Sequence, residues 1–389
     1  MATTSRARSS LGRSTAGRLG RNPAAAWRHL DLVLVGCVAA IAGLGALMVY
    51  SATRGPGGPE PFDTSFLEKQ VLYIALGFGA LLVTAAIDYR KFRDIAPMAY
   101  GGAVLLLLLV ASPIGSNKRG AQAWFQLGPF QLQPSELAKL ALIVGLAALV
   151  AQYREEIDLR RLGAAVGVGA APLALIMLQP DLGTGLVLVA IVVGILLVGG
   201  ARPKHLLALV LVGIVGVGIV VNSDMLADYQ RDRLTVFLDQ GGDGTRAEAY
   251  NLNQSKIAIG AGGVFGRGLF KGSQTRLSNV PEQHTDFIFT AVGEQLGFAG
   301  AATLLALFSI LCWRVWRTAQ LARDDFGSLV CVGVLAMLLF QIFENVGMTM
   351  GIMPITGIPL PLVSYGGSST LAVFAALGLV LNVHARRFS

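Results

Sequence analysis

Long apolar segments separated by short polar ones run through almost the whole chain. Each is long enough to cross the hydrocarbon core of a bilayer as a helix, which takes about 20 residues. The pattern predicts an all-α polytopic membrane protein with ten transmembrane helices, at Leu32–Tyr50, Glu68–Ile87, Ile95–Ser112, Ser135–Ala151, Leu162–Gln179, Leu182–Gly200, Lys204–Val221, Asp286–Trp313, Phe326–Met348 and Ser364–His384.

Composition supports this interpretation and excludes several others. Of the 389 residues, 54% are hydrophobic and 14% charged, which is too apolar for an ordinary soluble domain. The net charge of +8 does not indicate nucleic acid, because no nucleic-acid motif occurs and the basic residues cluster between the apolar segments. Cys37, Cys312 and Cys331 show no paired spacing, so we expect free thiols.

The ends of the chain and its basic residues predict the topology. Residues 1–30 contain arginines and no acidic residue, and are expected to be a disordered cytoplasmic tail ahead of a single membrane domain, 31–389. No convincing cleavage site follows the first apolar segment, so it should be an uncleaved anchor. Most of the other Lys and Arg fall on one side if both termini are cytoplasmic, and this places the long loop 222–285 outside, between the seventh and eighth helices.

A polar segment runs directly into the eighth helix and ends in Asp286, with Glu282 and His284 just before it. A carboxylate at the mouth of a membrane helix is costly, which makes Asp286 a functional candidate. The alternative is that Asp286 only caps a helix beginning at Phe287. The local pattern leaves both interpretations open.

The fourth helix also begins with charge. Glu136 falls where the helix dipole favours an anion, and Lys139 lies one turn deeper on the same face. The two are either a self-neutralising ion pair or a cation held ready for a phosphate. Arg119, in the preceding polar segment, adds a second cation on the same side, while Trp124 taken alone is typical of an interfacial anchor.

Two more outer segments contribute candidates. Asp181 is again an acidic residue at a helix start, here that of the sixth helix. It is either a site residue or a helix cap. In the loop 222–285, Gln254 and Lys256 precede a glycine cluster at Gly260–Gly268, which lacks the Walker A spacing and is a weak phosphate signal. Apolar residues among these glycines favour an interfacial segment, and the loop carries a cationic rim of Lys256, Arg267, Lys271 and Arg276.

The segment between the last two helices is rich in proline and glycine. Following Glu344 and Asn345, its three prolines and two paired glycines exclude a regular helix across residues 354–367. Irregular backbone at membrane depth is tolerated where it lines a cavity. We therefore weigh a pocket wall, including Ser364, against a purely structural bend.

Taken together, these segments resemble the SEDS family (shape, elongation, division and sporulation) over residues 32–387. The motifs that carry the resemblance are QPSELAK (133–139), QPDLGT (179–184), PEQHTDFIF (281–289), GEQLGF (293–298) and TGIPLPLVSYGGSS (356–369). The loops look more like the elongation member than the division member. Gln295 stands where the family usually has a second glutamate, and we expect little to follow from this change.

The resemblance implies a ten-helix glycosyltransferase that polymerises lipid II, a lipid-linked disaccharide-pentapeptide, into peptidoglycan during cell elongation. It implies an active site on the outer face of the bacterial cytoplasmic membrane. The implied partners are a class B penicillin-binding protein and other elongation-complex proteins, with no nucleic acid. The family's catalytic aspartate maps onto Asp286, and its other motif residues map onto Glu136, Lys139 and Asp181.

The chemistry suggests a mechanism as a hypothesis. Asp286 would deprotonate the acceptor 4-hydroxyl, and Lys139, Arg119 and Lys256 would stabilise the departing diphosphate. Mg²⁺ or Mn²⁺ could accompany the diphosphate, with Asp286 as a candidate ligand, and no nucleotide or organic cofactor is expected. The candidate site comprises Asp286 as catalytic residue and, for substrate binding, Arg119, Glu136, Lys139, Asp181, Gln254, Lys256, Glu282, His284 and Ser364.

Two other functions fit a bundle with intramembrane charges and broken helices. One is transport, as a lipid II flippase or an ion carrier. The other is a non-catalytic scaffold of a cell-wall complex. The charged residues gather at the predicted outer face, whereas a carrier should place its sites near the midplane, so the pattern favours an enzyme.

Overall fold

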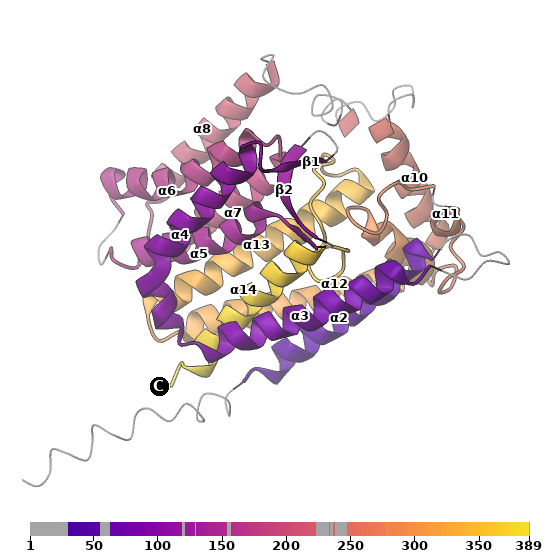
Figure 1. Ribbon diagram of the computed structural model, residues 1–389, viewed down its shortest axis with the longest axis horizontal. Helices are drawn as coiled ribbons and strands as arrows, with labels where there is room; N and C mark the ends of the chain where they lie inside the picture. The colour runs from indigo at the N-terminus through magenta and orange to yellow at the C-terminus, as the bar shows by residue number, and fades with distance from the viewer. Residues whose placement is uncertain are drawn as a thin grey trace, which may run out of the picture.

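The computed structural model describes residues 30–54, 63–118, 121–128, 130–153, 157–222, 233, 236–237, 247–277 and 279–388. Residues 1–29 of the predicted tail lie outside these ranges. A helix overlaps each predicted apolar segment (Figure 1), and these helices are α2 (Leu32–Thr53), α3 (Ser65–Ala86), α4 (Tyr89–Ala111), α5 (Pro134–Val150), α6 (Leu159–Met177), α7 (Leu182–Val198), α8 (Pro203–Asn222), α12 (Ile288–Leu321), α13 (Asp325–Met350) and α14 (Gly367–Ala385).

The chain is an integral membrane protein. Within the described residues, seven helices are long and apolar enough to cross a bilayer, namely α2, α3, α4, α6, α12, α13 and α14. Large apolar side chains are exposed on the outward faces, among them Leu105 and Leu108 on α4 and Leu207 and Val212 on α8. Apolar surface of this extent is unusual on a soluble monomer and suits contact with lipid.

Aspartates mark several helix starts. Asp31, Asp88, Asp158 and Asp324 each accept a hydrogen bond from a backbone amide in the first turn of α2, α4, α6 and α13. This satisfies an amide that the helix leaves unpaired. Because Asp88 caps the third helix, that helix begins at Tyr89, well before the residue that the apolar pattern predicted.

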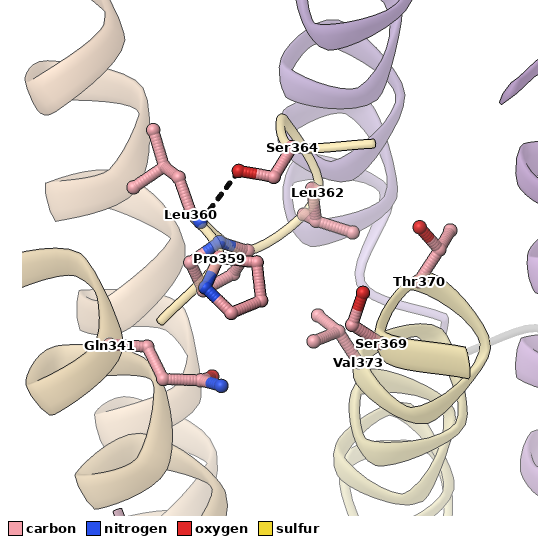
Figure 2. Close-up of a pocket in the computed structure, with 9 residues that line it drawn as sticks. Gln341, Pro359, Leu360, Leu362, Ser364, Ser369, Thr370 and Val373 are labelled. Atoms are coloured by element: carbon pink, nitrogen blue, oxygen red, sulfur yellow. Dashed lines mark hydrogen bonds between the residues drawn. The ribbon is translucent and has the colours of Figure 1, made fainter. Parts of the chain in front are cut away.

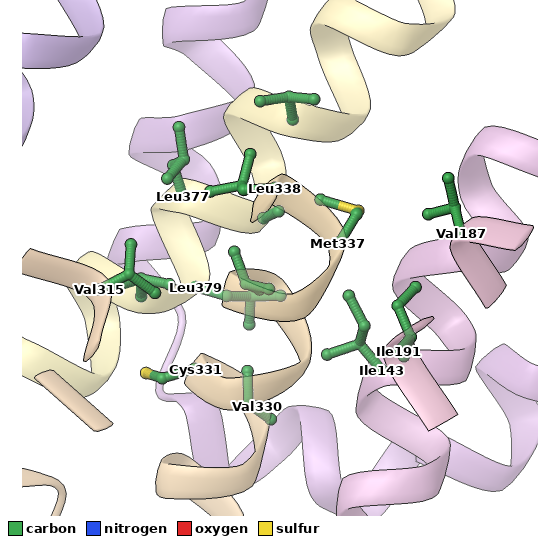
Figure 3. Close-up of a cluster of buried hydrophobic side chains, with 14 of the residues drawn as sticks. Ile143, Val187, Ile191, Val315, Val330, Cys331, Met337, Leu338, Leu377 and Leu379 are labelled. Atoms are coloured by element: carbon green, nitrogen blue, oxygen red, sulfur yellow. The ribbon is translucent and has the colours of Figure 1, made fainter. Parts of the chain in front are cut away.

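Helix α13 forms the centre of the bundle, packed against α5, α7, α12 and α14. Figure 3 shows Met337 and Leu338 of α13 beside Ile143 of α5, Ile191 of α7 and Leu377 of α14, all buried. The three cysteines are free and buried, as their spacing predicted. This core makes a rigid base for the segments that connect the helices.

Helix α12 is broken at Gly297, whose φ of 65° and ψ of −164° are not helical. The end of α10 (Ala247–Gly262) and the turn after it pair with the break: the Gly268 amide donates to the Gln295 carbonyl and the Phe298 amide to the Gly263 carbonyl. A Cβ on Gly266 would lie 2.1 Å from the Gln295 carbonyl oxygen. The glycine cluster therefore permits close backbone packing, and it satisfies the groups that the broken helix leaves unpaired.

The segment before α5 forms a sheet that the sequence pattern did not predict. Strands β1 (Ser116–Lys118), β2 (Ala121–Leu127) and β3 (Phe130–Leu132) pair antiparallel in the order β1-β2-β3. The Ser368 hydroxyl at the start of α14 donates to the Gln131 carbonyl at 2.8 Å. This bond fixes the sheet against the N-terminal end of α14.

Candidate active site

One cavity of about 1510 Å³ is lined by these connecting segments and by helices of the bundle. It is larger than the roughly 300–1,000 Å³ typical of a site for one small ligand. Six of the predicted site residues line it: Glu136, Lys139, Asp181, Glu282, His284 and Asp286. The structure thus brings together residues that lie far apart in the sequence.

Asp286 precedes the N-cap of α12. The helix begins at Ile288 with Phe287 at the cap position, one residue later than the capping interpretation required. The Asp286 carboxylate faces the cavity wall, because a Cβ on Gly357 would lie 3.3 Å from its Oδ2. This position suits a group that acts on a ligand better than one that caps a helix.

The backbone beside Asp286 is clamped to the segment between α13 and α14. The Asn345 side-chain amide, buried in α13, donates to the Asp286 carbonyl at 2.7 Å and to the Ile358 carbonyl at 2.8 Å. The Ser364 hydroxyl donates to the Thr285 carbonyl at 2.6 Å, and the Tyr365 amide to the His284 carbonyl at 2.9 Å. These bonds hold the Asp286 backbone in place.

The proline-rich segment forms a wall of the cavity, one of the two interpretations that its pattern left open: residues 354–359 and 365–369 line it. Ser364 lies behind this wall. Figure 2 shows it in a second, small cavity of about 10 Å³, where its hydroxyl accepts a hydrogen bond from the Leu360 amide at 2.8 Å. Ser364 is therefore placed to shape the wall, whereas the sequence suggested contact with substrate.

Glu136 and Lys139 form a buried pair. The Lys139 ammonium lies 2.9 Å from Glu136 Oε1, and the side chains of Lys139 and Glu136 are 2% and 4% exposed, respectively. Across the described residues this is the only hydrogen bond or ion pair of Lys139, and Glu136 Oε2 has none. Because an ammonium has three N–H donors, two remain available on the cavity side. The pair is thus neutralised and still able to bind an anion.

Asp181 caps a helix and also lines the cavity. Its carboxylate caps α7, accepting from the Thr184 amide at 3.0 Å and the Thr184 hydroxyl at 2.7 Å. Both residues also line the cavity. The first residues of α14 line it too, and α14 has no acidic residue in its first turn. Helix N-termini therefore direct partial positive charge into the cavity.

Besides Ser364, two predicted residues within the described part of the chain do not line this cavity. Gln254 and Lys256 are half-buried on α10 and do not line it. Arg119 lies outside the described residues. The structure adds Arg233, which lines the cavity and whose Nη1 would lie 3.7 Å from a Cβ on Gly357. The charged run around Arg233 was visible in the sequence, but nothing local indicates which of its side chains faces the site.

The cavity has two unlike walls. The wall formed by α6, α7 and α8 is apolar, with Leu173, Val189, Leu209 and Val210 among its residues. A second part of the lining carries the aromatic and amide side chains of Tyr73, Trp124, Gln131, Gln133 and Tyr365. The carboxylates and Lys139 line the same cavity, and this mixed lining suits an amphipathic ligand. Burial and the hydrogen bond with Tyr73 raise the pKa of Tyr365 to about 12, so its hydroxyl remains protonated at physiological pH.

The fold and this cavity define a class: integral membrane proteins that gather carboxylates and a buried cation around an amphipathic site. The comparisons with known proteins give the family. The chain matches the FtsW/RodA/SpoVE model, described as cell cycle protein, over residues 31–388. It belongs to this family, also known as the SEDS family.

Individual relatives agree with this assignment. The chain is 38% identical to stage V sporulation protein E of Bacillus subtilis over 91% of its own length and 96% of that protein. It is 34% identical to the peptidoglycan glycosyltransferase MrdB of Escherichia coli, over 92% and 94%. A chain of a peptidoglycan synthase complex, described as coordinating polymerization and crosslinking, superposes with a TM-score of 0.78 at 33% identity, covering 93% of this chain and 100% of that one.

Proposed function

We propose that this protein is a peptidoglycan glycosyltransferase that polymerises lipid II into glycan strands during cell elongation. One observation carries the proposal: the Asp286 carboxylate and the buried Lys139 ammonium line the same cavity. A base for an acceptor hydroxyl and a cation for a departing diphosphate are thus available in one site. The names of the relatives support the same activity, and the elongation role rests on the loop motifs.

The donor diphosphate would bind at Lys139. Its two unused N–H groups can donate to phosphate oxygens, and Glu136 holds the ammonium in place. The first turn of α14, at Gly367 and Ser368, supplies amide dipoles without an acidic residue to compensate them. The roles predicted for Arg119 and Lys256 remain predictions, and this mechanism does not depend on them.

The acceptor would react at Asp286. As the 4-hydroxyl oxygen of the acceptor glucosamine attacks the anomeric carbon of the donor, its proton passes to the Asp286 carboxylate. The bond from the anomeric carbon to the diphosphate oxygen breaks, and the diphosphate leaves as an anion with both electrons. A single displacement of this kind converts the α-linked donor into a β-linked product. Arg233, beside Gly357, would help to orient the carboxylate.

The apolar wall of α6, α7 and α8 would hold a polyprenyl chain. Val166, Leu173 and Met177 of α6 face the cavity together with Leu186 and Val193 of α7. A lipid tail gains free energy from such surface, about 25 cal/mol for each Å² removed from water. Lys139 lies close to this wall, because it belongs to α5, and α5 packs against both α6 and α7.

The residues of this site do not form a dedicated metal centre. Over the described residues, no three His, Cys, Asp or Glu side chains gather to hold a metal ion. Mg²⁺ or Mn²⁺ carried in with the diphosphate would take most of its ligands from phosphate oxygens, with Asp286 as the candidate protein ligand. Such an ion would neutralise the leaving group, and the mechanism above routes no step through it.

Gly357→Ala should impair catalysis more than stability. Gly357 has a φ of +76°, and the added Cβ would lie 3.3 Å from Asp286 Oδ2 and 3.7 Å from Arg233 Nη1. The left-handed conformation costs a non-glycine residue about 1–2 kcal/mol. Displacing the carboxylate should lower the polymerisation rate about 10- to 100-fold. Initial rates with lipid II and a thermal melt of the same preparation measure both effects, and an unchanged rate would contradict the placement of Asp286.

The finer topology is also part of the proposal. Ten helices would cross the bacterial cytoplasmic membrane, with both termini inside and the loop 222–285 and the cavity on the extracytoplasmic face. The basic segments between the helices support this orientation. A class B penicillin-binding protein would cross-link the strands, and the similarity to a chain of a peptidoglycan synthase complex supports such a partner.

Purified protein in detergent, incubated with lipid II, tests the proposed function directly. We expect polymer, seen as a ladder of lengthening glycan strands. A flippase would make none, because detergent removes the two compartments between which it transports. A scaffold would also make none. If the protein alone and the protein with its cognate transpeptidase both fail to produce strands, the proposal is wrong.

A further inference from the structure

Part of the cavity lining, apart from the apolar wall of α6, α7 and α8, has a chemistry that neither a lipid tail nor a diphosphate requires. We name it the aromatic–amide lobe, made of Tyr73 on α3, Trp124 on β2, Gln131 on β3, and Gln133 and Tyr365. These residues come from four separate stretches of the chain. The cavity is large enough to hold more than the reacting groups.

The Tyr73 and Tyr365 rings of the lobe are held in place by neighbouring rings. The Tyr73 and Tyr365 centroids lie 5.9 Å apart, and the His284 ring lies 5.7 Å from Tyr365. Phe66 packs edge-on against both Tyr365 and His284, at 5.2 Å and 5.0 Å. A Cβ on Gly367 would lie 3.0 Å from the Tyr73 ring, so only glycine leaves room for this packing. The two tyrosine rings of the lobe are therefore preorganised.

The two glutamines of the lobe have side-chain amides available for a ligand. Throughout the described chain, neither the Gln131 nor the Gln133 side chain has a hydrogen-bonding partner in the protein. Their backbone is nonetheless fixed, since the Gln133 amide donates to the Ser368 hydroxyl at 3.1 Å and Ser368 donates to the Gln131 carbonyl at 2.8 Å. An amide offers two donors and an acceptor, which match hydroxyl and acetamido groups.

We propose that the aromatic–amide lobe is a saccharide subsite that holds an N-acetylated pyranose of the glycan beside the reacting centre. Trp124 would stack on the apolar face of the sugar ring, and Gln131 and Gln133 would bind its hydroxyl and acetamido groups. A polyprenyl chain belongs in the groove of α6, α7 and α8, because only that wall is uniformly apolar. This inference rests on the proposed function for the identity of the glycan.

A soluble tetrasaccharide of β-1,4-linked N-acetylglucosamine tests the subsite without lipid, diphosphate or peptide. The full-length protein in detergent is titrated with it, and saturation-transfer NMR and calorimetry give the dissociation constant. Trp124→Ala should weaken binding about three- to tenfold, the magnitude of one aromatic contact, and Trp124→Phe should restore part of the loss. The double variant Gln131→Ala/Gln133→Ala should weaken binding by a similar factor, and it leaves the Trp124 ring unchanged.

Trp316→Ala is the matched control. Trp316 lies on α12, is 39% exposed and does not line the cavity, so its loss should leave the dissociation constant unchanged. The subsite is refuted if the wild type does not bind the tetrasaccharide, or binds it as tightly after Trp124→Ala and after the double glutamine change. Lipid II polymerisation by the same wild-type preparation separates the two claims. Binding without polymer refutes only the proposed function, and polymer without binding refutes only the subsite.

Discussion

Asp286→Asn should reduce polymerisation of lipid II by about 10²–10⁴-fold, the usual contribution of a general base. The substitution preserves the shape of the side chain and removes the group that accepts the acceptor proton. The Asp286 carbonyl would still accept its bond from Asn345, so the backbone of the site should stay in place. Initial rates with purified lipid II measure the effect, and a thermal melt checks the fold.

Asp158→Asn is a matched control for this change. Asp158 is also an aspartate at a helix start, where its carboxylate accepts from the Arg161 amide at 2.9 Å, but it does not line the cavity. Its substitution should cost no more stability than a helix cap, about 0.5–2 kcal/mol, and leave the rate near normal. A wild-type rate from Asp286→Asn would remove Asp286 from the mechanism.

Lys139→Ala should abolish polymerisation even with Asp286 intact, because the diphosphate would leave without its nearest buried cation. The change also leaves Glu136, whose side chain is 4% exposed, without its partner. Breaking a buried pair in this way destabilises a protein by about 3–5 kcal/mol. The rate and the melting temperature therefore have to be measured together.

A double variant separates the two effects of losing Lys139. Glu136→Gln/Lys139→Met removes both charges and leaves no buried charge unpaired, so much of the lost stability should return. If Lys139 binds the diphosphate, the double variant remains inactive. Full activity in the double variant would mean that Glu136 and Lys139 are only a structural ion pair, the alternative that the sequence left open.

Much of the candidate site could be predicted because it lies at helix starts. Glu136 and Asp181 follow Gln-Pro pairs, and Asp286 ends a polar segment ahead of an apolar one. Such patterns are local, since a charge next to an apolar segment is costly wherever the chain folds. The same locality misled in one respect: the pattern could not distinguish a cap from a cavity residue, and Asp181 proved to be both.

The residues that sequence reasoning missed depend on long-range contacts. Arg233 reaches the cavity from a helical residue in the connection between α8 and α10, and the clamp from Asn345 to the Asp286 carbonyl joins residues 59 positions apart. Gln254 and Lys256 were predicted from the sequence of the loop 222–285, but they lie outside the cavity lining. Strand β2 was read as part of a polar connection, although its short run of β-formers next to glycines was a signal for a strand.

The sequence by itself determined the membrane class, the positions of the helices and the charges at their mouths, because hydrophobic runs and helix-start chemistry act over a few residues. Only the tertiary structure decided that Asp286, Lys139 and Asp181 share one cavity with an apolar and an aromatic wall. It also shows why the glycines near Gly266 are needed: they let two backbone segments come into contact at the break in α12. Such contacts join distant segments, and no local pattern of residues specifies which surfaces will meet.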